Sequence, residues 1–158
     1  MFLDRDGVIN KKRDDYVKSV DEFILLSDVP KAINLLRQSQ FSVIIITNQS
    51  AINRGYLSHE GLDKIHQYMK LQLQKWDSFV DAIYYCPHRP EEKCICRKPN
   101  PGLLHQAIKD HTISKEESWL IGDSESDIEA AKRTGIRSIK IETDSSLLES
   151  VNQILGSI

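Results

Sequence analysis

The chain has 158 residues, a formal net charge of −2 and 40% hydrophobic residues. This length fits one domain over residues 1–158 with a sizeable core, and no excess of lysine and arginine is present to bind a nucleic acid backbone. Because the longest apolar run, FSVIIIT, is too short to span a bilayer and no basic-then-apolar leader opens the chain, we expect a cytoplasmic monomer that binds neither nucleic acid nor a membrane.

Five apolar runs suited to buried parallel strands alternate with helical patterns along the chain. The runs are MFL, FSVIIIT, AIYYC, SWLIG and SIKIE, and the helices are predicted over residues 29–39, 59–76, 101–110, 125–134 and 145–155. This alternation is typical of an α/β fold, here a single-domain Rossmann-like parallel sheet with helices on both faces. The first strand is short by several residues, which leaves open whether Met1 is the natural start.

Start and stop signals support these helices. Asn100 followed by Pro101 is typical of an N-cap with proline at the first helical position. Ser114 with Glu117 resembles a capping box, and Gly135 fits a helix C-terminus. Over residues 59–76 the apolar side chains share one face that we expect to pack on the sheet, namely Leu62, Ile65, Met69, Leu73 and Trp76.

Polar side chains follow four of the predicted strands. Ligands of open parallel sheets collect at the carboxyl ends of the strands, so these positions are candidates for a binding site. They are Asp4-Arg5-Asp6-Gly7 after the first strand, Thr47-Asn48-Gln49-Ser50 after the second, Arg97-Lys98-Pro99 after the third and its loop, and Gly122-Asp123-Ser124 after the fourth.

The acidic residues in this set predict a cation. Asp4 and Asp6 carry like charges that repel, and folding alone gives little reason to place them together. Mg²⁺ prefers oxygen ligands and substrates that bring phosphate oxygens, and it would neutralise Asp4 and Asp123. One carboxylate could then attack phosphorus while Thr47, Lys98 and the metal share the equatorial oxygens.

Each of these positions also has a purely structural interpretation. Aspartate and glycine after a strand are common turn formers, Thr47 could be a cap, and Lys98 could be a solvated surface charge. Asp127 is either a first-turn helix carboxylate or a group that orients Lys98. It is the occurrence of all four motifs in order that favours the functional interpretation.

The order DxDG, Thr-Asn, a lone Lys and GDxxxD resembles the haloacid dehalogenase superfamily of aspartate-based phosphohydrolases. The resemblance implies that Asp4 is a nucleophile that forms an aspartyl-phosphate and that Asp6 is the general acid and base. It also implies that Mg²⁺ is held by Asp4, the backbone carbonyl of Asp6, and Asp123. Thr47 and Lys98 would bind the transferred phosphoryl group.

All three cysteines lie in the segment YYCPHRPEEKCICRKP, together with one histidine. An odd number of cysteines argues against a disulfide framework, and Cys86, His88, Cys94 and Cys96 make a closed ligand set of the structural zinc type. A Zn²⁺-stabilised loop here would fix the position of Lys98. Free buried cysteines and a catalytic thiol are the alternatives. The remaining histidines are expected to be surface or core residues: His59, His66, His105 and His111.

Longer stretches resemble one subgroup of this superfamily. CPHRP followed by CICRKPNPG, together with DRDGVIN and TNQSAINRGYLS, is similar to the D-glycero-D-manno-heptose-1,7-bisphosphate 7-phosphatases and to the related histidinol phosphatases, from Phe2 to about residue 143. Ser124 stands where some members have a positive residue. The resemblance implies a sugar phosphate substrate bound by Arg13, Asp14, Asp15, Tyr16, Asn48, Gln49, Ser50 and Arg97, with Ser124 also near the substrate.

Two other functions remain open. A histidinol-phosphate phosphatase would share the metal pocket and the zinc loop, whereas a receiver-like signalling domain would accept a phosphoryl group and keep it. A receiver, however, lacks the second aspartate and the zinc loop. The gaps between the motifs leave no room for a separate cap domain, so short loops should close the site, with Arg54 and Tyr56 as candidate rim residues.

Overall fold

A five-stranded parallel sheet forms the centre of the computed structural model, which describes residues 1–157. The strands follow the order β3-β2-β1-β4-β5 across the sheet. Their bounds are β1 (Phe2–Leu3), β2 (Ile44–Asn48), β3 (Ala82–Cys86), β4 (Trp119–Gly122) and β5 (Arg137–Lys140). The central strand β1 pairs with both neighbours through Phe2, which lies opposite Ile44 and Leu120. The α/β fold class predicted from the sequence is therefore confirmed.

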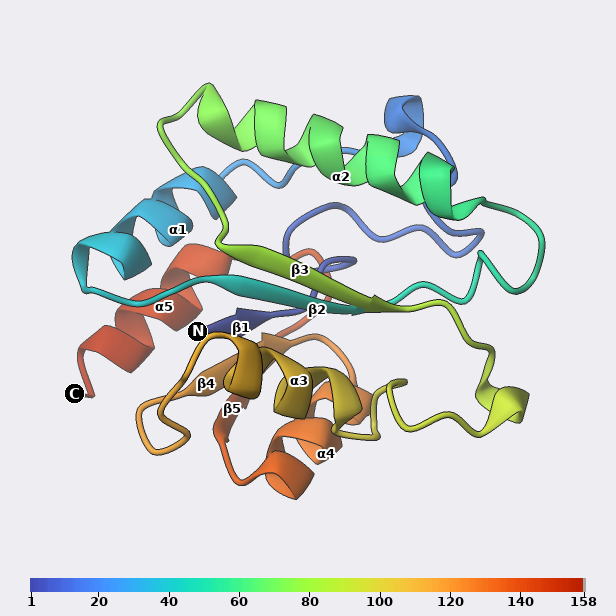
Figure 1. The fold of residues 1–158 in the computed structure, drawn as a ribbon. Helices are drawn as coiled ribbons and strands as arrows, with labels where there is room; N and C mark the ends of the chain where they lie inside the picture. The colour runs from blue at the N-terminus through green and yellow to red at the C-terminus, as the bar shows by residue number, and fades with distance from the viewer. Residues whose placement is uncertain (158) are drawn as a thin grey trace.

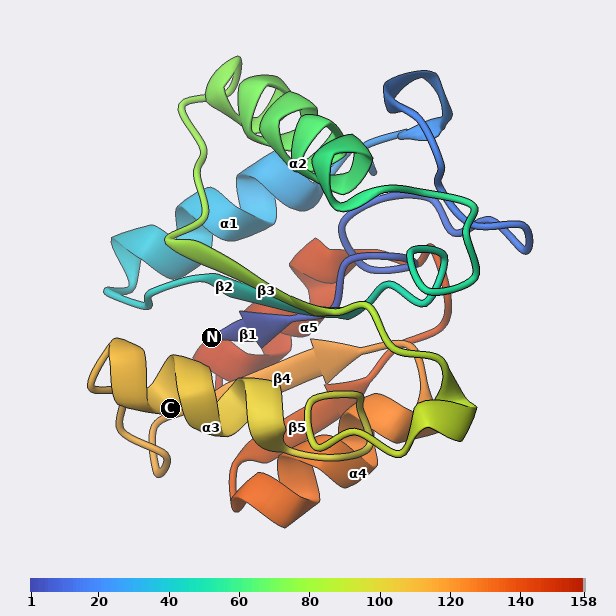
Figure 2. The ribbon, with the colours of Figure 1, turned by 45° about the vertical axis from the view of Figure 1, so that its right-hand side comes forward.

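Helices cover both faces of this sheet (Figures 1 and 2). One face carries α1 (Val29–Gln38), α2 (His59–Gln74) and α5 (Leu147–Leu155), and the other carries α3 (Gly102–Asp110) and α4 (Glu125–Thr134). Two short 3₁₀ helices, Val20–Glu22 and Pro90–Glu92, lie in the connections. The layers follow from the sequence pattern, because each apolar helix stripe needs a sheet face to bury it.

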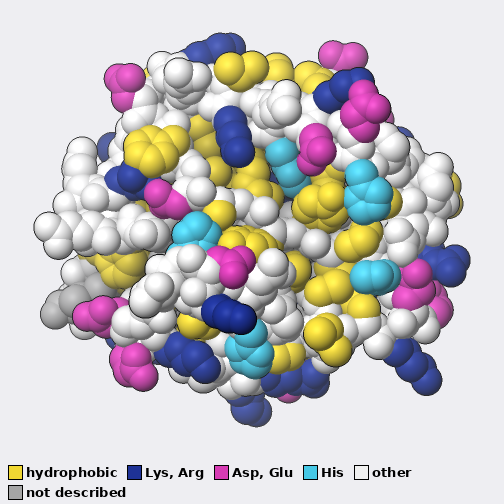
Figure 3. Space-filling model, in the orientation of Figure 1, with side chains coloured by type: hydrophobic (Ala, Val, Ile, Leu, Met, Phe, Trp, Pro, Cys, Tyr) yellow, Lys and Arg dark blue, Asp and Glu magenta, His cyan; other side chains and the backbone are white. Residues whose placement is uncertain are grey.

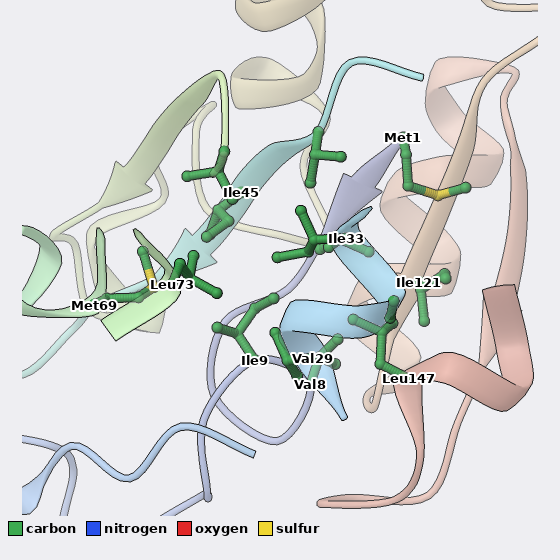
Figure 4. Close-up of a cluster of buried hydrophobic side chains, with 14 of the residues drawn as sticks. Met1, Val8, Ile9, Val29, Ile33, Ile45, Met69, Leu73, Ile121 and Leu147 are labelled. Carbon is green, nitrogen blue, oxygen red and sulfur yellow. The ribbon is translucent and has the colours of Figure 1, made fainter. Parts of the chain in front are cut away.

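The strands send alternate side chains into two separate cores. Leu3, Ile45 and Ile121 pack under α1, α2 and α5, while Phe2 and Ile44 pack under α3 and α4. Figure 4 shows the first of these cores, where Ile33 of α1 and Ile45 of β2 lie among other fully buried apolar side chains. This period of two is expected for a parallel sheet that is buried on both faces.

Three local expectations are wrong. Helix α3 begins at Gly102 with Pro101 at the N-cap, because the Asn100 amide donates instead to the carbonyl of Cys94. No helix follows Ser114, whose carbonyl accepts a hydrogen bond from Ser118 in a turn leading into β4. Trp76 lies beyond the end of α2 and is 66% exposed.

Basic and acidic side chains are interspersed over the face of the molecule in Figure 3. A face without one dominant sign of charge agrees with the small net charge of −2. Among residues 1–157, no helix has the length and apolar character needed to cross a membrane.

The sheet order places a topological switch point between β1 and β4. The chain moves outward from β1 to β2 and β3 on one side, and β4 and β5 lie on the other. Ligands of open α/β sheets bind in the crevice at such a point. In the described structure, the connection from β1 to α1 holds only loops, isolated bridges and one short 3₁₀ helix, so it adds no separate domain over the crevice.

Candidate active site

A pocket of about 410 Å³ opens at the carboxyl ends of the strands. It brings together most of the residues that the sequence analysis selected at the strand ends, although they come from distant parts of the chain. These are Asp4, Asp6, Arg13, Asp14, Tyr16, Thr47, Asn48, Gln49, Ser50, Arg97, Lys98, Asp123 and Ser124. Arg54 also lines the pocket, together with Lys12, Val17 and Ser126, which the sequence analysis did not select.

Lys98 lies at the bottom of the pocket between two carboxylates. Its Nζ is 2.9 Å from Oδ1 of Asp4 and 2.5 Å from Oδ1 of Asp127, and it donates to the carbonyl of Ile46. Only 2% of the Lys98 side chain is exposed, which excludes the solvated surface charge. Asp127 caps α4 through Ser124 as well, so it fulfils both of the roles considered for it.

Gly122 permits this approach of Asp127. A Cβ at this position would lie 2.3 Å from Cγ of Asp127, so any larger residue would push the carboxylate away from Lys98. The glycine of the GDxxxD motif is therefore needed on steric grounds, and not only to form a turn.

Asp4 is the most perturbed carboxyl group of the pocket. Burial raises its pKa to about 7, and the nearby Asp127 carboxylate adds to the effect, while Lys98 opposes both. Oδ1 accepts one hydrogen bond from the Arg5 backbone N–H and pairs with Lys98, which leaves Oδ2 for another ligand. A cation in the pocket would favour the ionised form of Asp4.

Asp6 has the opposite environment. Burial alone would raise its pKa, but the Arg5 guanidinium and hydrogen bonds from Asn10 and Gln49 hold it below the usual value. Arg5 donates to both carboxylate oxygens, at 2.9 Å and 3.0 Å. Two carboxylates in one pocket with different environments are typical of a site in which they have different roles.

Gln49 connects Asp6 to Thr47. Its Nε2 donates to Oδ2 of Asp6 at 2.8 Å and to Oγ1 of Thr47 at 2.9 Å. Because Thr47 accepts this bond, its own hydroxyl hydrogen is free to point at an anion in the pocket.

Asp123 faces Asp4 from the end of β4. Its Oδ2 accepts from Lys12 at 2.6 Å and from Thr143 at 2.8 Å, whereas the buried Oδ1 has no hydrogen-bond partner among residues 1–157. Gly7, at φ +89°, allows the loop after β1 to contact the loop after β4, since a Cβ there would lie 2.4 Å from Asp123 Oδ2.

This donor set fits a hard cation. Ligand atoms of Asp4, Asp123 and Asp127 lie within 4.8 Å of one another, and carboxylate oxygens are the ligands that Mg²⁺ prefers. The unpaired oxygen of Asp123 is the observation that supports the fit, because a buried carboxylate oxygen without a partner is unfavourable.

Several predicted contact residues also hold the pocket wall together. Asn48 uses both ends of its amide to bond the backbone N–H and carbonyl of Lys98. Arg97 donates to the His88 carbonyl, and Ser124 donates to Asp127. Ser50 is buried in the pocket lining.

Asp15 is the one predicted contact that the structure places outside the pocket lining. Its carboxylate is exposed and forms ion pairs with Arg13 and Lys18, which turn it toward its own loop. Tyr16 does line the pocket, and its ring lies 6.0 Å from that of Tyr56, which is 60% exposed. Tyr56 itself stands outside the lining.

The four predicted zinc ligands converge in the loop after β3. Sγ of Cys86 lies 3.5 Å from that of Cys94 and 2.9 Å from that of Cys96, and Nδ1 of His88 is 3.4 Å from Cys86. The cysteines form no disulfide. Arg97 donates its backbone N–H to Cys94, so this cluster directly supports the segment that carries Lys98. Three thiols and one imidazole at this separation could hold a tetrahedral metal ion.

The sequence analysis did not identify the residues that support the pocket side chains from behind. Arg5 is fully buried and its Nη1 lies 3.1 Å from Nε2 of His66, on α2. The available signal was a histidine on the apolar face that includes Ile65 and Met69. Lys12 and Thr143 carry no local motif, and only the fold brings them to Asp123.

The pocket thus combines a buried carboxylate beside a lysine, a second carboxylate, a threonine hydroxyl and a group of carboxylate oxygens that could hold a cation. These groups suit transfer of a phosphoryl group to Asp4 and its later release to water.

Comparisons with known proteins show similarity to phosphatases of one family. The family model described as HAD-hydrolase-like matches residues 95–154. The chain is 39% identical over 135 residues to the D-glycero-β-D-manno-heptose-1,7-bisphosphate 7-phosphatase of Neisseria meningitidis serogroup A, covering 85% of this chain and 72% of that protein. It is 40% identical over 138 residues to the enzyme of the same name from Helicobacter pylori, covering 87% and 79%.

Solved structures show the same likeness. The D,D-heptose 1,7-bisphosphate phosphatase of B. bronchiseptica, complexed with magnesium and phosphate, superposes with a TM-score of 0.86 at 31% identity, over 100% of this chain and 98% of that chain. A HAD-like phosphatase from Mesorhizobium loti superposes with a TM-score of 0.85 at 28% identity, over 99% and 85%.

Proposed function

Because the chain belongs to the haloacid dehalogenase-like hydrolases and is a phosphatase of that family, we propose that it removes the 7-phosphate of D-glycero-D-manno-heptose 1,7-bisphosphate. The observation that carries the proposal is the pocket in which Asp4, Asp6 and Lys98 meet at the switch point of the sheet. The choice of substrate rests on the activity for which the relatives are named. We assign the whole chain to one phosphatase domain.

In the first step Asp4 attacks phosphorus. A new bond forms between an Asp4 carboxylate oxygen and phosphorus while the bond from phosphorus to the ester oxygen breaks. Lys98 and the Thr47 hydroxyl stabilise the negative charge that spreads over the equatorial oxygens. Lys98 is suited to this because burial beside Asp4 and Asp127 holds its position without exposing it to water.

Asp6 completes both steps by moving a proton. It donates a proton to the departing ester oxygen, and the resulting carboxylate then takes a proton from the water that attacks the aspartyl-phosphate. Hydrolysis returns Asp4 and releases inorganic phosphate. Without substrate and cation, burial raises the pKa of Asp4, and the Arg5 guanidinium holds the pKa of Asp6 below its usual value although burial alone would raise it. The assigned roles therefore require that Mg²⁺ favours the ionised form of Asp4 and that the negative charge of the bound phosphate raises the pKa of Asp6.

Asp4, the backbone carbonyl of Asp6, and Asp123 would hold Mg²⁺. When bound, Mg²⁺ supplies positive charge that keeps Asp4 ionised and neutralises phosphoryl oxygens. Asp127, whose ligand atom also lies close to those of Asp4 and Asp123, would keep its contacts with Lys98 and Ser124.

We assign Zn²⁺ to Cys86, His88, Cys94 and Cys96 as a structural ion. We expect about one zinc per chain by elemental analysis of protein purified without added metal. Cys94→Ser should lower the melting temperature by roughly 5 °C or more and reduce activity, because one ligand is lost beside Arg97. Ile95→Ser is the matched control, since Ile95 is 81% exposed in the same loop. Metal-free protein of full stability would contradict the assignment.

The substrate is tested by a side-by-side assay of released phosphate with Mg²⁺. We expect kcat/KM for the heptose 1,7-bisphosphate to exceed that for histidinol phosphate by at least about tenfold, equivalent to about 1.4 kcal/mol. The physical reason is the basic rim of the pocket, where Arg13, Arg54 and Arg97 can meet a second phosphate. Equal or reversed preference would remove the heptose assignment and leave the phosphatase assignment.

Arg97→Ala tests whether Arg97 contributes to this substrate preference. It should weaken the heptose reaction more than the histidinol phosphate reaction, because only the first substrate carries a second phosphate. Arg89→Ala is the matched variant, since Arg89 lies in the same loop but outside the pocket lining. It should leave the ratio of the two kcat/KM values unchanged.

Histidinol-phosphate phosphatase activity is the second candidate. Asp14 and Tyr16 line the rim and could contact a cationic amine and an imidazole, so the same assay decides between the two substrates. A receiver-like domain would accept a phosphoryl group slowly and keep it. Multiple turnovers in the assay would exclude that function.

A further inference from the structure

The guanidinium of Arg5 lies completely buried directly behind Asp6. Its Nη2 contacts both carboxylate oxygens of Asp6, at 2.9 Å and 3.0 Å, so a single charged nitrogen restrains both oxygens. Its Nη1 lies 3.1 Å from Nε2 of His66. Because a guanidinium can only donate, Nε2 of His66 is the acceptor in this contact.

His66 is well suited to accept this bond. It lies on the buried face of α2 and is only 6% exposed. Burial and the neighbouring Arg5 charge lower the pKa of His66 to about 3, so the ring stays neutral and keeps a lone pair for Arg5. The ring of Tyr85 packs edge-on against the imidazole, with ring centroids 6.1 Å apart.

The arginine has few other attachments. Its Nε is buried without a hydrogen-bond partner among residues 1–157, so the side chain is held by Asp6 at one end and His66 at the other. Asn10 and Gln49 each contact only one oxygen of Asp6. Loss of the His66 acceptor would leave a buried donor unpaired and allow the guanidinium, with Asp6, to turn.

We propose that His66 is a positioning residue that acts through Arg5 to aim the Asp6 carboxyl group at the departing oxygen of the substrate. The inference rests on the proposed role of Asp6 as proton donor. It goes beyond that role because it identifies a residue on α2, far from Asp6 in the chain, as a determinant of proton transfer.

The test is whether a variant of His66 distinguishes two leaving groups. An alkyl phosphate needs a proton on its departing oxygen, whereas p-nitrophenyl phosphate releases a stable anion that does not. His66→Leu should lower kcat/KM for the alkyl ester by about tenfold or more and change that for the aryl ester by less than about twofold. Both assays use the Mg²⁺-loaded enzyme, and kcat/KM reports the steps up to transfer of the phosphoryl group to Asp4.

Three further variants make the result specific. His66→Gln retains an acceptor oxygen and should recover most of the alkyl ester activity. Arg5→Lys keeps the charge but loses the separate nitrogens that contact Asp6 and His66, and it should show the same selective loss if His66→Leu does not fold. Met69→Ala, on the same buried face, disturbs packing alone and should lower both reactions equally.

Asp6→Asn separates this inference from the proposed function. If Asp6→Asn shows no difference between the alkyl and aryl esters, the proton-donor role of Asp6 fails and the inference fails with it. Suppose instead that Asp6→Asn lowers the alkyl ester reaction selectively. If His66→Leu then lowers the alkyl and aryl ester reactions equally, or leaves both unchanged, only the role of His66 is overturned. A selective loss in both variants, with recovery in His66→Gln, supports the proposal.

Discussion

Asp4→Asn should abolish turnover, with kcat reduced by at least about 10⁴-fold. The change replaces the proposed nucleophile and a proposed Mg²⁺ ligand with an amide of almost the same shape. We expect the fold to remain, because the Arg5 backbone N–H can still bond the side-chain oxygen and Lys98 keeps Asp127 as its partner. The measurement is released phosphate under saturating substrate, with circular dichroism to verify folding.

Asp15→Asn is the control for this experiment. Asp15 is an exposed carboxylate that pairs with Arg13 and Lys18 outside the pocket lining, so its loss should change kcat by no more than about twofold. Substantial steady-state activity in Asp4→Asn would refute the nucleophile assignment. A similar loss in both variants would indicate a general effect of removing negative charge.

Lys98→Met should reduce both stability and activity. It removes the cation between Asp4 and Asp127 and leaves two buried carboxylates facing each other, for which we expect a loss of about 3–5 kcal/mol in the free energy of unfolding. The same change removes positive charge from the transferred phosphoryl group, so kcat should fall by at least about 100-fold. Denaturant unfolding without added Mg²⁺ at pH 8 measures the first effect, because Asp4 of the unsubstituted protein, with a pKa of about 7, is then mostly ionised and paired with Lys98.

Two comparisons separate the stability effect from the catalytic one. Lys12→Met removes a partly exposed cation from the buried Asp123 carboxylate and should cost less stability than Lys98→Met, since water reaches only the Lys12 end of that pair. Lys98→Met combined with Asp127→Asn should recover part of the lost stability, because one unpaired charge is removed, but none of the turnover. If Lys98→Met is no less stable than Lys12→Met, the buried pairs are not the source of stability that we infer.

The catalytic and metal-ligating candidates could be identified from the sequence because their signals are local. DRDG, TNQS, GDSESD and the cysteine loop each follow a recognisable strand, and a parallel sheet necessarily brings strand ends to one edge. The helix stop at Gly135 was predictable for the same reason, since a residue with φ +79° after a helix is a conformation that glycine adopts readily.

The supporting contacts depended on the tertiary structure. Nothing in the local sequence pairs Lys12 with Asp123 or Arg5 with His66, because these contacts exist only when the loops and α2 pack against the sheet. The same applies to Asp15, whose neighbours turn it away from the pocket.

Composition, periodicity and motif order thus determined the fold class, the strand-end candidates and the clustered candidate metal ligands, since each of these depends on residues close together in the chain. The tertiary structure alone decided which candidates line the pocket, which carboxylate lies beside Lys98, and which histidine lies behind Asp6. Those relations join residues far apart in sequence, and the packing of helices and loops on the sheet determines whether they meet.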